Sequence, residues 1–258
     1  DAQAGRLVRI ARFTQGGEPR YGIVDGPELV VVEGHPLISR YATTGERIPI
    51  KEVKLLAPTI PSKVVCVGKN YADHIAEMGL ATSAEPTIFF KPSSAIVGPG
   101  DPIVLPHQSQ QVELEAELTV VIGQYTKNVS EADALGHVWG YTIANDVTAR
   151  DLQASDDQWA RSKAFDSFCP LGPWIETDFD PDSQQISSRI NGETAQDATI
   201  DQMLHGVAKI VSYVSHNMSL LPGDIILTGT PSGISKLSAG DIVECEIEGI
   251  GTLLNPVI

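Results

Sequence analysis

Short apolar runs bounded by glycine turns recur along this chain, and strand patterns predominate over helical ones. Three such runs in the first part of the sequence are typical of strands, at residues 6–13, 21–24 and 28–32. They predict a small β-rich domain over residues 1–57. A stretch with two prolines at 57–62 (APTIPS) then interrupts regular structure, so we expect a larger domain over residues 63–258.

The larger domain also consists mainly of predicted strands. Apolar runs that end at a glycine or follow a Gly-Asp turn predict strands, at residues 64–67, 103–105, 225–227 and 242–247. The pair Asn191-Gly192 is a strong two-residue hairpin signal. Apolar spacing or a capping box predicts four helices, at residues 70–78, 151–161 and 200–214 and from 130 onward. Strands with irregularly interspersed helices favour a strand-rich α+β fold over a doubly wound sheet.

Three glutamates alternate in the apolar run at residues 112–123 (VELEAELTVVIG): Glu113, Glu115 and Glu117. Side chains two apart on a strand share one face and lie about 6 to 7 Å from each other. At an effective dielectric near 20, neighbouring carboxylates at that distance repel by roughly 2 kcal/mol. Water at a solvated strand face would screen this repulsion, and a bound cation would reverse it. Both interpretations are open at this point.

Composition and charge exclude several classes of protein. Hydrophobic residues at 42% and charged residues at 20% are ordinary for a soluble globular protein. A formal net charge of −15 repels phosphate backbones, so nucleic acid is not an expected partner. We find neither an 18-residue apolar run nor an apolar signal core, and we expect a cytoplasmic protein with no membrane contact. The three cysteines lack CxxC spacing, which predicts reduced thiols.

A second acidic feature lies where an apolar strand runs into a polar cluster at residues 141–151 (YTIANDVTARD). The dipeptide Asn145-Asp146 at a strand end is often only a turn. Together with the glutamate row, however, Asp146 could complete a set of oxygen ligands for Mg²⁺ or Mn²⁺. No histidine or cysteine accompanies these carboxylates, which disfavours zinc.

His74 and Glu77 lie three residues apart in the helix predicted at 70–78, so they share a face. A carboxylate beside an imidazole orients it as a general base, although a helical ion pair on the surface gives the same spacing. The segment that follows, residues 79–85 (GLATSAE), is small and polar. A short helix on such a stem is a candidate lid.

Two lysines lie beside aromatic residues, Lys91 in IFFKPSS and Lys163 in RSKAFDSF. A lysine near carboxylates can bind a substrate carboxylate or share the charge of a developing enolate. The alternative is a side chain with a buried stem and a solvated ammonium.

The loop at residues 228–233 (TGTPSG) follows a strand and has glycines that permit close approach of the backbone. It lacks the Gly-Lys-Ser/Thr ending of a P-loop, so we exclude nucleotide binding. Contacts from its hydroxyls or amides to a small anion remain possible.

In this order, these segments resemble the fumarylacetoacetate hydrolase family. The resemblance covers about residues 63–258 and rests on VGKNYADHIAEMG, FFKPSSAIVGPGD, ELEAELTVVIG, GYTIANDVTARDLQ, SKAFDSFCPLGP, RINGETAQ, PGDIILTGTPSG and GIGTLLNPV. It implies a mixed, strand-rich β-roll for the larger domain. Residue by residue, it implies metal ligands at Glu115, Glu117 and Asp146, catalytic roles for His74, Glu77 and Lys163, and substrate contacts from Lys91, Arg150, Gln153 and Thr230. Glu113 stands where the family often has Asp, so the resemblance assigns it no role.

The resemblance also implies a substrate class, namely small 2-oxo acids. We expect Mg²⁺- or Mn²⁺-dependent cleavage of a C–C bond that leaves a pyruvate enolate stabilised by the metal. Hydrolysis of an acylpyruvate such as fumarylpyruvate and decarboxylation of oxaloacetate both fit. An isomerase of 2-hydroxyhepta-2,4-diene-1,7-dioate in aromatic catabolism is the alternative, and a non-catalytic scaffold for divalent ions is a remote one. The family commonly pairs, so we expect a homodimer, with the run 225–227 and the helix from residue 200 as shared surfaces.

Overall fold

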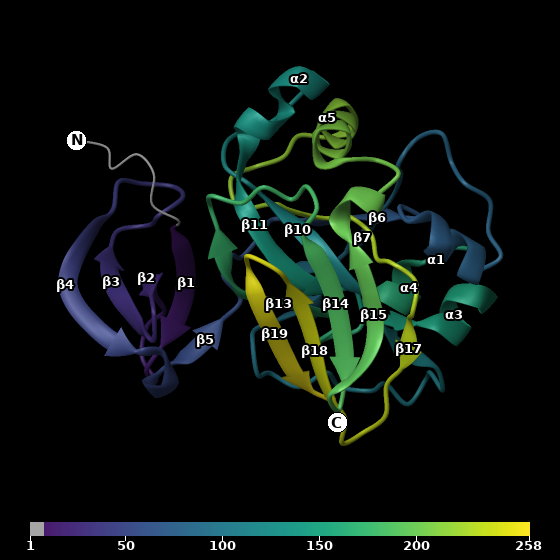
Figure 1. Ribbon diagram of the computed structural model, residues 1–258, viewed down its shortest axis with the longest axis horizontal. Coiled ribbons are helices and arrows are strands. Elements are labelled where there is room, and N and C mark those ends of the chain that lie inside the picture. Colours follow the sequence, from purple (N-terminus) through teal and green to yellow (C-terminus); the bar gives the residue numbers. More distant parts are fainter. Residues whose placement is uncertain (1–7) are drawn as a thin grey trace.

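A long mixed sheet runs through the whole molecule in the computed structural model, which describes residues 8–258. Its order is β4-β3-β2-β1-β13-β11-β10-β16-β6-β7, with β5 beside β1 and β8 beside β13. Figure 1 shows the N-terminal strands as a separate small body joined to the larger one through β1 and β5. The bounds are β1 Arg9–Thr14, β2 Arg20–Asp25, β3 Glu28–Glu33, β4 Ala42–Pro49, β5 Lys54–Leu56, β6 Val64–Gly68, β7 Thr87–Lys91, β8 Ile96–Val97, β10 Ala116–Ile122, β11 Val138–Asn145, β13 Cys169–Glu176 and β16 Ile225–Leu227.

Two smaller sheets complete the larger body and confirm the predicted strand-rich α+β fold. A four-stranded sheet with the order β15-β14-β18-β19 packs on β10, β11 and β13 (Figure 1). A three-stranded sheet, β12-β9-β17, lies beside the long sheet. The bounds are β9 Val112–Leu114, β12 Thr148–Ala149, β14 Gln185–Ile190, β15 Glu193–Thr199, β17 Ser235–Lys236, β18 Ile242–Ile247 and β19 Gly251–Pro256. The hairpin predicted at Asn191-Gly192 joins β14 to β15.

The helices are short. They are α1 Ala72–Glu77, α2 Glu131–Ala134, α3 Arg150–Ser155, α4 Ala160–Lys163 and α5 Val207–Asn217, with single 3₁₀ turns at Ile50–Glu52, Ser93–Ala95, Leu135–His137 and Ile200–Gln202. Across residues 8–258, none of these helices has the length and apolar character needed to cross a membrane.

Two of the predicted helices are interrupted. The segment 151–161 forms most of α3 and the start of α4, with a break between them. The segment 200–214 forms a 3₁₀ turn and then α5. The reason for the second break is a tertiary contact: Leu204 N and His205 N donate to the backbone oxygen and the side-chain oxygen of Asn70, at 2.8 Å each. These bonds hold the intervening residues in an extended path, which the local periodicity does not reveal.

The strand predictions need three corrections. Residues 103–105 form no named strand, although Ile103 bridges to Val257. The strand predicted at 6–13 begins at Arg9 as far as the described residues show, and residues 6 and 7 lie outside them. The run predicted over 112–123 is broken at Glu115 into β9 and β10.

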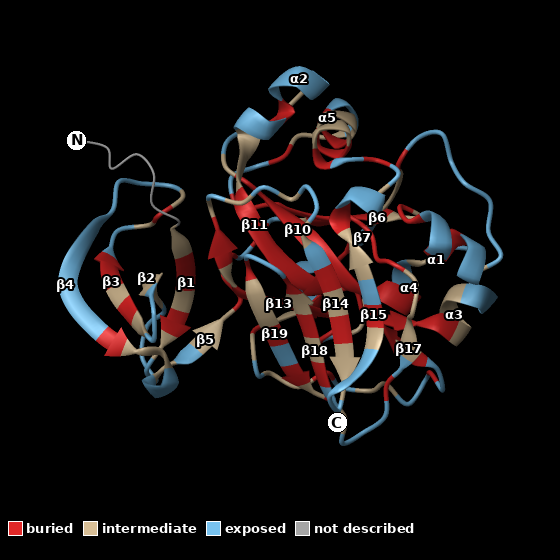
Figure 2. Ribbon diagram, in the orientation of Figure 1, coloured by how far each residue is buried: buried red, intermediate tan, exposed pale blue. Residues whose placement is uncertain are grey.

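The centre of the long sheet is buried on both faces (Figure 2). All seven residues of β10 are buried, as are all three of β16. The expectation that Ile225–Leu227 forms part of a dimer surface is therefore wrong, because β16 pairs with β10 on one side and with β6 on the other. The N-terminal strands enclose a small core of their own, formed by Ala11, Phe13, Leu29, Val31 and Ile48.

A buried carboxylate fixes the start of β6. The side chain of Asp224 accepts hydrogen bonds from Ser62 N at 2.9 Å, Lys63 N at 3.1 Å and Leu221 N at 2.8 Å, and it pairs with the Lys63 ammonium. Burial acts to raise the pKa of Asp224, but the ammonium of Lys63 and these N–H groups outweigh it and lower the pKa.

We expect Asp224→Asn to reduce the free energy of unfolding by about 3 kcal/mol at neutral pH, because it removes a buried, hydrogen-bonded charge. A carboxyl group with a lowered pKa stabilises the fold above its ordinary pKa, and this contribution is lost as pH falls through the lowered value. The difference between the variant and the wild type should therefore shrink in acid. Urea unfolding at several pH values measures it, with the exposed Asp157→Asn as a control. A loss as small as that of the control would show that the network contributes little.

Candidate active site

The break between β9 and β10 creates the site, because it turns Glu115 out of the strand ladder. Glu115 N donates to the side-chain oxygen of Asn145 at 2.9 Å, and Asp146 N donates to Glu115 O at 2.8 Å. On the other side of the break, Ala116 N donates to Gln196 Oε1 at 3.0 Å. The first two bonds bring the end of β11 against the start of β10 and place Asp146 beside the two glutamates, and the third joins β15 to the start of β10.

Three carboxylates converge at this point. Glu115, Glu117 and Asp146 are all buried, and each offers an oxygen atom that lies within 4.8 Å of the others. The glutamate row is therefore not a solvated strand face. Glu113, the third member of the row, points elsewhere and pairs with Arg150 Nε at 2.7 Å.

Two lysines and an arginine neutralise most of this charge. Lys163 Nζ contacts Glu115 Oε2 at 3.0 Å and Asp146 Oδ2 at 2.7 Å. Arg150 bridges Glu113 and Glu115. Burial acts to raise the pKa of Glu115, but the charges of Lys163 and Arg150 dominate and hold that pKa below its ordinary value. Lys163 stays protonated, because Asp146 and Glu115 outweigh the effect of burial and raise its pKa.

Glu117 differs from the other two carboxylates. Among residues 8–258 it has no ion-pair partner, and its carboxylate accepts one hydrogen bond, from Gly229 N at 2.8 Å. Burial, Asp146 and Glu115 raise its pKa well above the ordinary value. A buried carboxylate without a cation is costly. The site is thus consistent with a divalent metal ion, and its all-oxygen donor set suits Mg²⁺ or Mn²⁺.

The three carboxylates form part of the wall of a cavity, which Lys163 and Arg150 also line. Lys91 does not line this cavity. Its ammonium lies behind the triad, where it donates to Asp146 Oδ1 at 2.5 Å and to Val147 O at 3.0 Å. The side chain is almost completely buried. The structure places this residue as a support of Asp146, at a position that differs from the substrate contact expected from the sequence.

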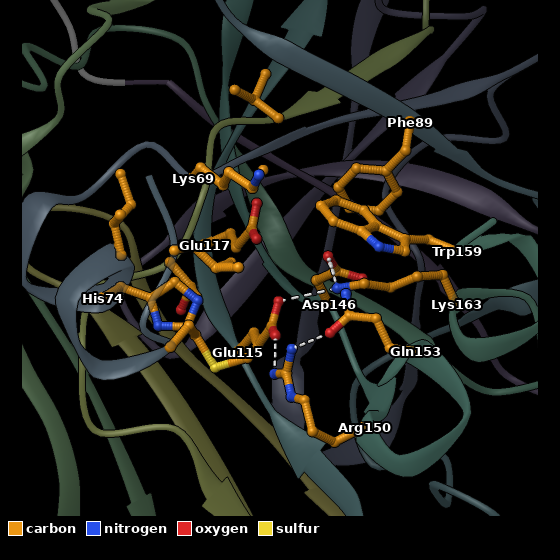
Figure 3. A pocket seen from close by; sticks show the side chains of 16 residues that line it. Lys69, His74, Phe89, Glu115, Glu117, Asp146, Arg150, Gln153, Trp159 and Lys163 are labelled. Carbon is orange, nitrogen blue, oxygen red and sulfur yellow. Dashed lines mark hydrogen bonds and ion pairs between the residues drawn. The ribbon is translucent and has the colours of Figure 1, made fainter. Parts of the chain in front are cut away.

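The other residues expected to contact substrate do line the cavity: Arg150, Gln153 and Thr230. Gln153 accepts a hydrogen bond from Arg150 (Figure 3). Thr230 Oγ1 donates to Ala116 O at 2.9 Å and accepts from Gln196 Nε2 at 2.7 Å. The loop at 228–233 therefore holds the start of β10 in place, both directly through Thr230 and through Gln196, a residue that the sequence analysis did not single out.

The predicted lid pair lies over the cavity. His74 Nδ1 and Glu77 Oε2 are 3.0 Å apart on α1, and His74 lines the cavity. Glu77 Oε1 accepts a hydrogen bond from Gly233 N at 3.0 Å. Glu77 thus connects the histidine to the 228–233 loop and orients its ring.

Lys69, Phe89 and Trp159 are among the residues of the cavity wall that sequence reasoning did not assign to the site (Figure 3). The rings of Phe89 and Trp159 pack edge to face with centroids 5.3 Å apart. Lys163 Nζ lies 4.9 Å from the centroid of the Phe89 ring. The position of Phe89 two residues before Lys91 was the available signal, since alternate strand residues share a face. Trp159 had no such signal.

Two family models match the chain. The one described as fumarylacetoacetate (FAA) hydrolase C-terminal matches residues 63–258, and the one described as Rv2993c-like, N-terminal, matches residues 8–58. Protein Rv2993c of Mycobacterium tuberculosis is 53% identical, over 97% of this chain and 98% of its own length. The mitochondrial oxaloacetate tautomerase FAHD2A of Bos taurus is 47% identical, over 82% of this chain and 71% of its own length.

Among solved structures, 2-hydroxyhepta-2,4-diene-1,7-dioate isomerase from Mycobacterium marinum superimposes with a TM-score of 0.90 at 45% identity. The match covers 97% of this chain and 98% of that one.

Proposed function

This chain belongs to the fumarylacetoacetate hydrolase family, and on that premise we propose that it is a Mg²⁺- or Mn²⁺-dependent enzyme that cleaves a C–C bond in a small 2-oxo acid. The observation that carries the proposal is the buried triad, in which Glu117 has no cationic partner among the described residues. Glu115, Glu117 and Asp146 would hold the ion. When bound, a divalent cation supplies Lewis acidity that withdraws electron density from the 2-oxo group.

Lys163 is the residue best placed to share the charge that develops on the substrate. The bond that breaks joins the carbon next to the 2-oxo group to the carbon beyond it. Its electron pair stays on the pyruvate part of the substrate as an enolate. The ammonium of Lys163 lines the cavity between Glu115 and Asp146 and stays protonated. A fixed positive charge in a buried site stabilises such an oxyanion far better than it would in water.

His74 and Glu77 supply what hydrolysis needs in addition. For an acylpyruvate, His74 takes a proton from water, and the hydroxyl adds to the distal carbonyl carbon. The C–C bond then breaks, which releases a carboxylic acid and the enolate of pyruvate, and the enolate takes up a proton. Glu77, at 3.0 Å from Nδ1, holds the imidazole ring and stabilises the cation that forms.

Decarboxylation of oxaloacetate uses fewer of these groups. The bond to the distal carboxylate breaks, CO₂ leaves, and the same enolate remains to be protonated. No water is added, so His74 is not required as a base toward water. One site therefore supports both reactions.

A second candidate function is proton transfer without bond cleavage. It is supported by the relatives, because the bovine protein is named an oxaloacetate tautomerase and the M. marinum protein a 2-hydroxyhepta-2,4-diene-1,7-dioate isomerase. Both reactions move a proton between carbon and oxygen of a 2-oxo or 2-hydroxy acid. His74 in the cavity wall is a suitable proton carrier for either. Homodimer formation and a cytoplasmic location stay predictions from the sequence.

Metal removal tests the proposed function. We expect pyruvate release from oxaloacetate or an acylpyruvate with Mg²⁺ or Mn²⁺, and its loss after treatment with EDTA, with recovery when the metal is restored. The panel includes acetylpyruvate, fumarylpyruvate and 2-hydroxyhepta-2,4-diene-1,7-dioate. Metal-dependent isomerisation without pyruvate release would favour the second candidate. Metal binding without turnover of any substrate would favour a non-catalytic scaffold.

A further inference from the structure

Lys69 is the unpaired cation of the cavity wall. Lys163 and Arg150 also line the cavity, but both form ion pairs with the carboxylates. Within residues 8–258, Lys69 has no hydrogen bond or ion pair. Its ammonium is thus free to bind an anion that enters the cavity.

The backbone around Lys69 is held in one position. Lys69 has φ at 59°, a left-handed conformation that costs a residue with a side chain ~1 kcal/mol. On one side, Gly68 packs so closely on Trp159 that a Cβ atom would lie 2.9 Å from its ring. On the other side, the buried amide of Asn70 donates to Thr228 O at 2.7 Å and to His205 O at 3.0 Å. This strained turn keeps the side chain of Lys69 at the cavity, and such strain concentrates at functional positions.

The charges of the site leave a place for one more cation. Four buried carboxylates, those of the triad and of Glu113, face three buried cations, those of Lys91, Arg150 and Lys163. With all four carboxylates ionised the net charge is one negative, and a divalent ion makes it one positive. A substrate with one carboxylate brings the total to zero. A substrate with two carboxylates leaves one negative charge, which Lys69 is able to neutralise.

We propose that Lys69 is a specificity-determining residue that binds the second carboxylate of a 2-oxo dicarboxylic acid. This inference rests on the proposed function and narrows its substrate class to dicarboxylates such as oxaloacetate or fumarylpyruvate, in preference to acylpyruvates with an uncharged end. Lys69 and Arg150 approach the cavity from opposite sides (Figure 3), so the two ends of a short diacid meet different cations. Lys69 is half-buried, and its contact with a carboxylate is a charge-assisted hydrogen bond, stronger than a neutral one.

Binding of two unreactive probes tests the proposal without turnover. The probes are 2-oxoglutarate and 2-oxopentanoate, which have the same chain length and differ in the terminal carboxylate. Binding of both is measured with Mg²⁺ present. We expect calorimetry to show tighter binding of 2-oxoglutarate by the wild type, and a reduction of that preference by roughly 10- to 100-fold in Lys69→Met. Lys69→Arg keeps the charge and should keep most of the preference. Lys51→Met, on the exposed turn after β4, is the matched control.

Kinetics give the second readout. In Lys69→Met, the ratio of kcat/KM for oxaloacetate to that for acetylpyruvate should fall by a similar factor. If Lys69→Met lowers kcat/KM equally for both substrates and leaves the probe preference unchanged, the role of Lys69 is refuted while the proposed function stands. If neither substrate is turned over but the probe preference depends on Lys69, the proposed function fails and the dicarboxylate site stands.

Discussion

Glu117→Gln is expected to abolish binding of Mn²⁺ and Mg²⁺ and to reduce metal-dependent turnover by on the order of 10³-fold or more. The reason is that a Lewis acid lowers the activation free energy by several kcal/mol. The same substitution should not destabilise the metal-free protein. Glu117 is the triad member without a cationic partner among the described residues, and a glutamine oxygen can still accept the hydrogen bond from Gly229 N. Removing a buried, uncompensated charge is neutral or stabilising.

The pH dependence of this effect has a defined sign. A carboxyl group with a raised pKa stabilises the fold while it is protonated, and that contribution is lost as pH rises through the raised value. Burial raises the pKa of Glu117. The metal-free wild type should therefore lose stability as pH rises from the ordinary pKa of a glutamate through the raised pKa of Glu117. Glu117→Gln should not show this loss.

Glu115→Gln is the matched control, since it removes a carboxylate that lies between Arg150 and Lys163. We expect it to destabilise the metal-free protein by about 3 kcal/mol, because both cations stay buried with fewer partners. Thermal unfolding without Mn²⁺ separates the two variants, and unfolding with Mn²⁺ measures the loss of ion binding. At 100 times Kd the ion should stabilise the wild type by about 2.7 kcal/mol and Glu117→Gln by nothing. Wild-type affinity for Mn²⁺ in Glu117→Gln would remove that residue from the ligand set.

His74→Ala is expected to leave metal affinity intact and to reduce acylpyruvate hydrolysis by roughly 10² to 10⁴, the range for removing one positioned acid or base. Decarboxylation of oxaloacetate should suffer less, because it needs Lys163 and the metal but no activated water. Both rates are measured on the same variant, together with its Mn²⁺ affinity.

Glu77→Gln provides the companion variant. Its amide can still occupy the position 3.0 Å from His74 Nδ1, but it carries no charge to stabilise an imidazolium. We expect it to show the same selective loss of hydrolysis, smaller than that of His74→Ala. Equal losses in both reactions for either variant would mean that α1 closes the cavity or positions substrate, and the role in water activation would be withdrawn.

The triad was predictable because its signal is local. Glu115 and Glu117 alternate in an apolar run that predicts a strand, and Asp146 follows another such run, so two short patterns point to one cluster. The break at Glu115 was not predictable. It depends on the side chains of Asn145 and Gln196, which lie 30 and 80 residues away in sequence from the N–H groups that they bind. That break separates Glu113 from the other two glutamates.

Contacts between residues far apart in sequence also explain the other differences between the predicted and the observed structure. The helical period over 200–214 is real, but Asn70 captures the N–H groups of residues 204 and 205 and interrupts the helix. Lys91 and Lys163 look alike in sequence, each beside aromatic residues, yet one supports Asp146 from behind and the other lines the cavity. Lys69 carries no pattern at all, since a single lysine after a strand is usually a solvated residue.

The most direct test of the account is a joint titration of metal occupancy and turnover. Mn²⁺ is added stepwise to the metal-free protein, bound Mn²⁺ is measured by electron paramagnetic resonance, and pyruvate release from oxaloacetate is measured in the same samples. We expect the rate to rise in proportion to bound metal and to reach its plateau at one ion per chain. Turnover that persists without bound metal, or full occupancy without turnover of any 2-oxo acid, would contradict it.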